Sequence, residues 1–423
     1  MPESSSQNGQ QGKPSPSFVS NHAMRVRLRG SITLADLQAA LDGLRARHPA
    51  LIDADAHFPL QETTGCTGTA WLDAARQELL QGFPAGGPFA RFVLLRIKEE
   101  EEQADLLGVF HHGVCDGMSG VYVLRDILRL LGEPGLVLEA LPRPVDMRNL
   151  IPTSVRTSRA VQMRVNGFVS ILRLRLFFAR IFPTRKRPAV EQDSATARLT
   201  PDKRMCILTD RLSPVQTAAL VQRCKTEGVT VHAAVSTAWL RAFAALPGEN
   251  RSLVHSASSP VSLRERLSIP TTSGLYMANA VTKINASPRR DFWDAAREFK
   301  RKMNRACTDE ALFLYPLMIG AVFSSIREKD LKYVLPALFD RPVRYDFSVT
   351  NLGRLDLSAC FGPLEVEAFT NLVNTSEHER TLCVNTFDGR LTWSLLFRES
   401  KMTPSQGREL LRLASEQLSK AVA

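Results

Sequence analysis

The sequence lacks the signatures of several common protein classes. Its seven cysteines are scattered, with no Cys-x-x-Cys pair and no zinc-type spacing of cysteine and histidine. We therefore expect reduced thiols, a cytoplasmic location and no metal site. No uninterrupted apolar run reaches the length of about 18 residues that indicates a membrane-spanning helix. Aromatic residues make up only 7% of the chain and no zinc-finger, homeodomain or RNP motif is present, so nucleic acid is not an expected partner.

Acidic residues are missing from one long stretch, and most of the net charge of +11 arises there. Between Asp146 and Glu191 there are ten lysines and arginines and no aspartate or glutamate. Within this stretch, residues 166–188 can form a helix with arginines on one side and apolar residues on another. The apolar side predicted for this helix consists of Phe168, Ile171, Leu172, Phe178 and Ile181.

Two stretches with the same order of predicted elements indicate two halves of similar plan. Residues 24–51 alternate like a strand and continue into a helix capped at Thr33, and residues 205–231 repeat this order with a cap at Ser213. Later strand signals include a hairpin that turns at Asp388. These signals predict an α/β protein with mixed sheets in both halves. The predicted parts are a disordered tail (1–22), an N-terminal subdomain (23–150), a basic crossover linker (151–195) and a C-terminal subdomain (196–423).

The segment LGVFHHGVCDGMSG, residues 107–120, places two adjacent histidines between a predicted strand and a predicted helix. A neutral imidazole with a pKa near 6.5 can take a proton from a hydroxyl or amine that attacks a carbonyl. One of His111 and His112 suffices for this, and Asp116 could brace the loop by pairing with an arginine. On the residues alone, ordinary core or turn histidines remain an alternative. A pair of metal ligands is a weaker one, because adjacent histidines point in different directions.

The segment HHGVCDG fits an H-H-x-x-x-D-G motif. It resembles the acyltransferase superfamily that includes chloramphenicol acetyltransferase, peptide condensation domains, wax ester synthases and polyketide-associated acyltransferases. The segments ARHPAL (46–51), GPFARFVLLR (87–96) and EGVTVHAAVSTAWLRAF (227–243) also resemble that family and extend the match over most of the chain. The resemblance implies two chloramphenicol-acetyltransferase-like subdomains arranged in a V around a central tunnel.

The same resemblance implies roles for individual residues. His112 matches the general base and His111 a supporting residue. Asp116 matches a structural carboxylate that pairs with Arg264 from the second half. Gly117 would let the chain turn closely and leave its N–H near the developing oxyanion.

The signatures that are missing narrow the chemistry. The sequence contains no G-x-S-x-G elbow, Walker loop or G-x-G-x-x-G fingerprint, so neither a covalent serine mechanism nor nucleotide activation is indicated. The resemblance implies an acyl group that arrives as a thioester, on coenzyme A or on the phosphopantetheine arm of an acyl or peptidyl carrier protein. No permanently bound cofactor is implied.

Departures from the family patterns favour one branch. The arginine-rich and tyrosine-led motifs of peptide condensation domains are absent. The D-F-G-W-G motif of the plant acyl-CoA-dependent acyltransferases, which belong to the same superfamily, is absent as well. Residues 348–357, SVTNLGRLDL, resemble instead the stand-alone alcohol O-acyltransferases and polyketide-associated acyltransferases. Within them, Thr350 and Asn351 could line the site opposite His112, or could simply mark a strand end and turn.

We therefore expect a monomeric, cytoplasmic enzyme that forms an ester on a hydroxyl-bearing lipid or secondary metabolite. A free-standing condensation enzyme that forms an amide, and a protein that binds an acyl group or carrier without catalysis, are the alternatives. Residues 166–188 fit a helix at a membrane surface, a crossover helix packed between the halves, or a docking patch for an acidic carrier protein or coenzyme A phosphates. Our hypothesis is that this segment brings the protein to a lipid surface or acidic partner. The cations to which this hypothesis refers are Arg173, Arg175, Arg180, Arg185, Lys186 and Arg187.

Overall fold

A computed structural model provides the structure of the chain. It describes residues 21–52, 56–84, 86–98, 100, 102–181, 205–247, 253–269, 271–325, 345–374 and 380–422. Most of the predicted tail, and the predicted cations Arg185, Lys186 and Arg187, lie outside the described residues. The same holds for the side chains of Arg175, Phe178, Arg180 and Ile181.

The first half is built on a six-stranded mixed sheet. Its spatial order is β2 (Leu60–Cys66), β3 (Ala90–Ile97), β4 (Gln103–His111), β1 (Asn21–Arg29), β10 (Leu364–Asn374) and β9 (Cys360–Phe361). β2 runs parallel to β3, and the other neighbours are antiparallel. This confirms the predicted mixed sheet.

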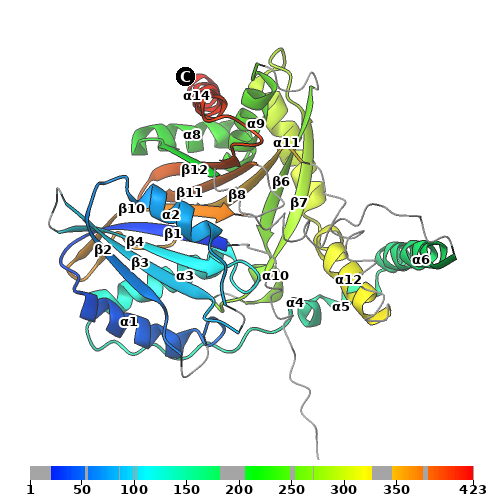
Figure 1. The fold of residues 1–423 in the computed structure, drawn as a ribbon. Coiled ribbons are helices and arrows are strands. Elements are labelled where there is room, and N and C mark those ends of the chain that lie inside the picture. The colour runs from blue at the N-terminus through cyan, green and yellow to red at the C-terminus, as the bar shows by residue number, and fades with distance from the viewer. Residues whose placement is uncertain are drawn as a thin grey trace, which may run out of the picture.

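The second half repeats this plan with a second six-stranded mixed sheet (Figure 1). Its order is β5 (Met205–Arg211), β12 (Arg390–Arg398), β11 (Arg380–Phe387), β8 (Phe347–Arg354), β6 (Val254–Ser262) and β7 (Met277–Asn285). The predicted hairpin joins β11 to β12, and both Asp388 and Gly389 have positive φ there, at 44° and 71°. A two-residue turn with this backbone matches the twist of the flanking strands.

Helices pack on the faces of both sheets. On the first sheet, α1 (Leu34–Arg47) and α3 (Gly117–Gly132) pack on one face, and α2 (Trp71–Leu80) packs on the other. The second sheet carries α8 (Pro214–Thr226), α9 (Val231–Ala244), α11 (Phe292–Ala306) and α14 (Pro404–Val422). Capping boxes at Thr33 and Ser213 begin α1 and α8, as the sequence predicts.

A third apolar cluster lies between the two sheets and includes α2. Leu107 and Val109 of β4 contribute to it from the first sheet, and Ile207 and Leu396 contribute from the second. Near this contact the Asn385 side-chain amide donates to Asn371 Oδ1 at 2.9 Å. The two halves therefore share a core and do not merely touch.

Two boundaries differ from the sequence-based division of the chain. β1 already begins at Asn21, inside the predicted tail, because its first residues pair with the end of β4. β9 and β10 complete the first sheet although they fall in the predicted C-terminal subdomain, since β10 pairs with β1 between residues 365 and 374. A strand pattern shows that residues 364–374 extend, but it does not show which sheet they join.

The basic stretch forms α4 (Met147–Leu150), α5 (Thr153–Thr157) and α6 (Arg159–Ile181), which run along α12 (Asp309–Ser325). In Figure 1, α6 stands well away from both sheets. The predicted apolar side of α6 is partly wrong. Leu172 is buried with Val161, Val165 and Val169, whereas Ile171 is 54% exposed. Around the axis of α6, the predicted apolar side lies about one-quarter turn away from the side that packs on α12.

Candidate active site

The H-H-x-x-x-D-G segment lies where β4 ends and α3 begins. His111 is the last residue of β4, and Gly117 is the first residue of α3. Asp116 caps the helix, because its carboxylate accepts the Ser119 backbone N–H at 2.8 Å. A strand that ends in a tight turn and a capped helix therefore holds the two histidines and the aspartate close together.

One ring nitrogen of His112 is held by a backbone carbonyl. Its Nδ1 lies 3.2 Å from the Cys115 carbonyl oxygen. A carbonyl oxygen only accepts, so Nδ1 carries the proton and Nε2 carries the lone pair of the neutral ring. Removal from bulk water lowers the pKa of His112, and the Cys115 hydrogen bond and the Asp116 carboxylate offset this only in part. The ring is therefore unprotonated at neutral pH.

His111, at the end of β4, makes contacts different from those of His112. Its Nδ1 accepts the Gly113 backbone N–H at 3.0 Å. Its ring centroid lies 5.9 Å from those of Phe83 and Phe89, and both contacts are T-shaped. Burial lowers the pKa of His111 as well. Its contacts shape the turn that carries His112. Over the described ranges, no group of three histidine, cysteine, aspartate or glutamate residues is arranged to hold a metal ion.

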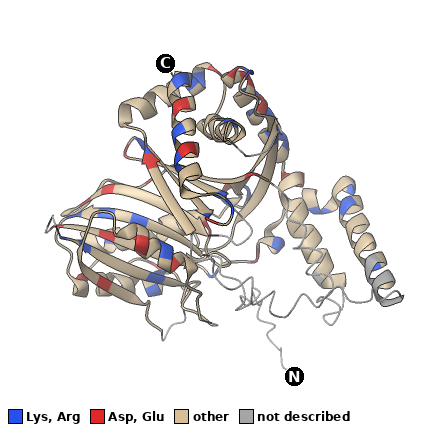
Figure 2. Cartoon of the chain, turned by 45° about the horizontal axis from the view of Figure 1, so that its top comes forward, with Lys and Arg blue, Asp and Glu red and all other residues tan. Residues whose placement is uncertain are grey.

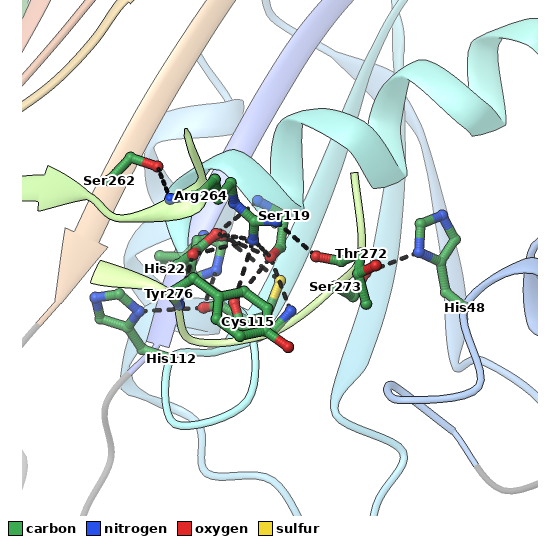
Figure 3. Close-up of polar contacts among 12 residues, drawn as sticks. His22, His48, His112, Cys115, Ser119, Ser262, Arg264, Thr272, Ser273 and Tyr276 are labelled. Atoms are coloured by element: carbon green, nitrogen blue, oxygen red, sulfur yellow. Dashed lines mark hydrogen bonds and ion pairs between the residues drawn. The ribbon is translucent and has the colours of Figure 1, made fainter. Parts of the chain in front are cut away.

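A third histidine, His22, lies in the site and was missed in the sequence. Its Nε2 is 2.9 Å from the same Cys115 carbonyl oxygen, and its ring centroid is 5.3 Å from that of His112 (Figure 3). Burial lowers the pKa of His22 well below its usual value, and His112 adds to this effect. A Cβ on Gly120 would lie 2.9 Å from the His22 ring, so this glycine makes room for it. No motif in the sequence marks His22, which falls inside the predicted tail. It reaches the site because β1 pairs with β4, where His22 lies opposite Phe110.

The structure brings Asp116 and Arg264 together from the two halves. Arg264, at the start of α10 (Arg264–Leu267), donates from Nη2 to Asp116 Oδ1 at 2.9 Å and to Oδ2 at 3.0 Å. The same nitrogen lies 2.7 Å from Ser119 Oγ, and Nη1 donates to the Thr272 carbonyl at 2.7 Å. The Tyr276 N–H donates to Asp116 Oδ2 at 2.9 Å. The buried charge pair is thus surrounded by further hydrogen bonds, which is the condition under which such a pair is tolerated.

A second polar contact joins the same two segments. The His48 ring lies 2.8 Å from Ser273 Oγ through Nδ1 and 3.1 Å from Asp126 Oδ2 through Nε2, and Arg47 donates to Asp126 at 2.9 Å. This order of serine, histidine and aspartate resembles a nucleophilic triad. However, His48 and Ser273 are buried, so the serine has no open side for a substrate. The contact holds residues 272–276 against α1 and α3.

The remaining predicted site residues lie at the edge of this arrangement. A Cβ on Gly117 would lie 2.9 Å from Leu352 Cδ2, and its φ is not positive. The glycine therefore permits the close approach of β8 and is not required by a turn conformation, which corrects the predicted reason for it. Asn351 accepts the Gly353 N–H at 2.8 Å within its own strand. Contact of Thr350 or Asn351 with a substrate stays a prediction.

Comparison with known families supports the acyltransferase resemblance. Residues 203–395 match the family described as phthiocerol/phthiodiolone dimycocerosyl transferase C-terminus. No curated protein sequence matches the chain.

Solved structures with this fold include enzymes of different activities. The chain is similar to the TRI3 trichothecene 15-O-acetyltransferase of Fusarium sporotrichioides, with a TM-score of 0.66, 14% identity and coverage of 96% of this chain and 92% of that one. It is similar to polyketide synthase associated protein 5 of Mycobacterium tuberculosis, with a TM-score of 0.62, 16% identity and coverage of 97% and 98%. It is similar to the first condensation domain of the calcium-dependent antibiotic synthetase, with a TM-score of 0.63, 12% identity and coverage of 96% and 92%.

Because the identities are low, these structures establish the fold, while the family model carries the sequence relationship. The family match covers residues 203–395, which include most of the strands of the second six-stranded sheet. The chain therefore has the two-sheet α/β fold of these acyltransferases and condensation domains, and its second half matches the dimycocerosyl transferase C-terminal family over residues 203–395.

Proposed function

We propose that the protein moves an acyl group from a thioester to a hydroxyl acceptor and forms an ester. The observation that carries this proposal is the contact of His112 Nδ1 with the Cys115 carbonyl oxygen at 3.2 Å. This leaves Nε2 as the basic nitrogen. The family match to a dimycocerosyl transferase and the fold shared with a 15-O-acetyltransferase support ester formation.

In the proposed reaction, His112 Nε2 takes the proton of the acceptor hydroxyl as its oxygen attacks the thioester carbonyl. The carbon–oxygen bond forms, the tetrahedral intermediate collapses, and the carbon–sulfur bond breaks. The leaving thiolate takes the proton from His112, so the free thiol of coenzyme A or of a phosphopantetheine arm is released. We assign the Gly117 N–H to the oxyanion, and a tunnel between the halves to the approach of the two substrates.

Asp116 and Arg264 act as positioning residues in this proposal. Their ion pair joins the loop that carries His112 to the second half of the molecule. Substrates that enter between the halves would meet a histidine whose position depends on this connection. His111 supports the same turn through Gly113. No resident cofactor is needed, because the thioester supplies the activated acyl group.

The test is release of free thiol by the purified chain, given a panel of acyl-CoA donors and hydroxyl or amine acceptors. We expect turnover with hydroxyl acceptors and a fall of about 10²-fold or more in kcat for His112→Ala, with an unchanged Tm. His57→Ala, which removes an exposed histidine outside the site, is the matched control.

Full turnover by His112→Ala would overturn the mechanism. Products formed only with amines would assign the chain to amide formation instead. Tight binding of acyl thioesters, with no thiol release under any acceptor, would indicate a protein that binds an acyl group or carrier without catalysis.

A further inference from the structure

Helix α6 has apolar residues on two opposite sides. Its inner side is buried and consists of Val161, Val165, Val169 and Leu172. Of these, Val169 and Leu172 pack on Val322 of α12. Its outer side carries Met163, Ile171, Leu174 and Phe177, which are 70%, 54%, 54% and 56% exposed. A helix that only crossed between the halves would need the inner side alone.

Helical geometry places this outer side opposite the packed one. At about 100° per residue, Leu174 lies about 180° around the helix from Val165. Arg173 lies about 80° from Val165 in one direction, and Arg164 lies about 100° from it in the other. Both arginines are exposed, so they border the outer apolar stripe on its two edges.

Negative charge is scarce around this face. No aspartate or glutamate occurs from residue 147 to residue 190. The acidic residues at the start of the neighbouring α12 are already engaged, because Asp309 accepts from Arg266 at 2.8 Å and Glu310 accepts from the Ser158 hydroxyl at 2.6 Å. Figure 2 shows basic and no acidic residues along α6.

We infer that the outer face of α6 binds the surface of an anionic membrane. An apolar stripe bordered by arginines is the composition of helices that lie in the membrane interface, with the stripe among the acyl chains and the cations at the phosphates. The stripe from Met163 to Phe177 follows the helix for roughly 20 Å, as a flat lipid surface requires.

The position of the helix suits this contact. α6 projects from the two sheets and lies apart from β4 and α3, so a membrane in contact with α6 would leave the connection between β4 and α3 uncovered (Figure 1). A second copy of this chain is a poorer occupant, because a symmetric contact would bring the arginines of the two copies together. In the described part of the chain no helix is long and apolar enough to cross a bilayer. The inference is therefore attachment to one surface.

The experiment is flotation of the full chain with vesicles of phosphatidylcholine, with and without phosphatidylserine, in the absence of substrates. We expect flotation with the anionic vesicles at low salt and a loss of it as salt is raised. The Met163→Ser, Ile171→Ser, Leu174→Ser triple variant should remain in the unbound fraction. The Arg164→Gln, Arg173→Gln double variant should lose about fivefold in partition coefficient per arginine.

The matched control is Val215→Ser combined with Lys225→Gln, which removes an exposed apolar residue and an exposed cation from α8. It should float like the wild type, and all variants should keep the wild-type Tm and helical circular dichroism.

The inference is overturned if the wild type does not float with anionic vesicles at low salt, or if both α6 variants float as well as it does. Dimers that the triple variant abolishes, without vesicle binding, would assign the face to a second copy. A raised KM for a carrier-bound donor, without vesicle binding, would assign it to an acidic carrier protein. Because flotation uses no substrate, its result is independent of the proposed reaction.

Discussion

Two polar clusters hold the same segment of the second half against the first half, and they differ in charge. The arginine cluster consists of Asp116, Ser119 and Arg264, and it binds the backbone of residues 272–276. The histidine cluster consists of Arg47, His48, Asp126 and Ser273. Both use a carboxylate of α3, one at its N-cap and one almost three turns later.

The difference lies in what remains when one member is lost. The partner of Asp116 is a buried arginine, so removing Asp116 leaves a guanidinium without its counter-charge. In the histidine cluster the contact with the second half is a neutral one between His48 and Ser273. Burial lowers the pKa of His48, although Asp126 acts against this. Asp126 keeps Arg47 as its partner. We therefore expect the loop of His112 to depend strongly on the arginine cluster for its position, and only weakly on the histidine cluster.

The largest effect should come from breaking the arginine cluster. Asp116→Ala should lower the free energy of unfolding by about 3–5 kcal/mol, because it leaves Arg264 buried and unpaired. Turnover should fall as well, since the loop of His112 loses its connection to the second half. Urea unfolding and thiol release measure the two effects. Asp116→Leu combined with Arg264→Met should recover much of the stability, and a single-variant loss below about 1 kcal/mol would contradict the comparison.

A smaller effect should follow from breaking the histidine cluster. Ser273→Ala removes one neutral hydrogen bond and should cost about 1 kcal/mol, with His48 and Asp126 still joined. Ser405→Ala, an exposed serine on α14, is the control and should change little. Should Ser273→Ala destabilise the chain as strongly as Asp116→Ala, the two clusters would not differ in the way proposed.

The smallest effect concerns the pH dependence of stability. Burial lowers the pKa of His48 and lowers the pKa of His232 to about 4, so both rings stay neutral in the folded chain. In the unfolded chain these histidines take up protons near pH 6.5. The free energy of unfolding therefore has its highest value above that pH and falls as the pH drops toward the lowered pKa values of the folded chain.

His48→Gln should reduce this loss between pH 6.5 and pH 5, as measured by urea midpoints. Ser405→Ala, which removes no titratable group, should leave the slope unchanged. If the urea midpoint of His48→Gln fell with pH as steeply as that of the wild type, His48 would not be kept neutral by burial. The distinction between the two clusters would then fail.

Local features of the site were predictable from the sequence. The motif and its family resemblance placed His111, His112 and Asp116 in one turn and proposed Arg264 as the partner of Asp116, and the structure brings these residues together. The caps at Thr33 and Ser213 and the turn at Asp388 were predictable because each depends on neighbouring residues in the chain. Ser273 was not, because no motif marks a serine whose partner lies 225 positions away.

By itself, the sequence determined the α/β class, the motif loop with its capped helix, and the basic stretch without acidic residues. These depend on hydrophobic period, capping chemistry and charge, which act over a few residues. Only the tertiary structure decided that β10 completes the first sheet, that His22 joins His112 at one carbonyl, and that α6 turns Met163 and Leu174 outward. Each of these depends on which distant surfaces meet, and an apolar residue has the same pattern in the sequence whether it faces a neighbouring helix or solvent.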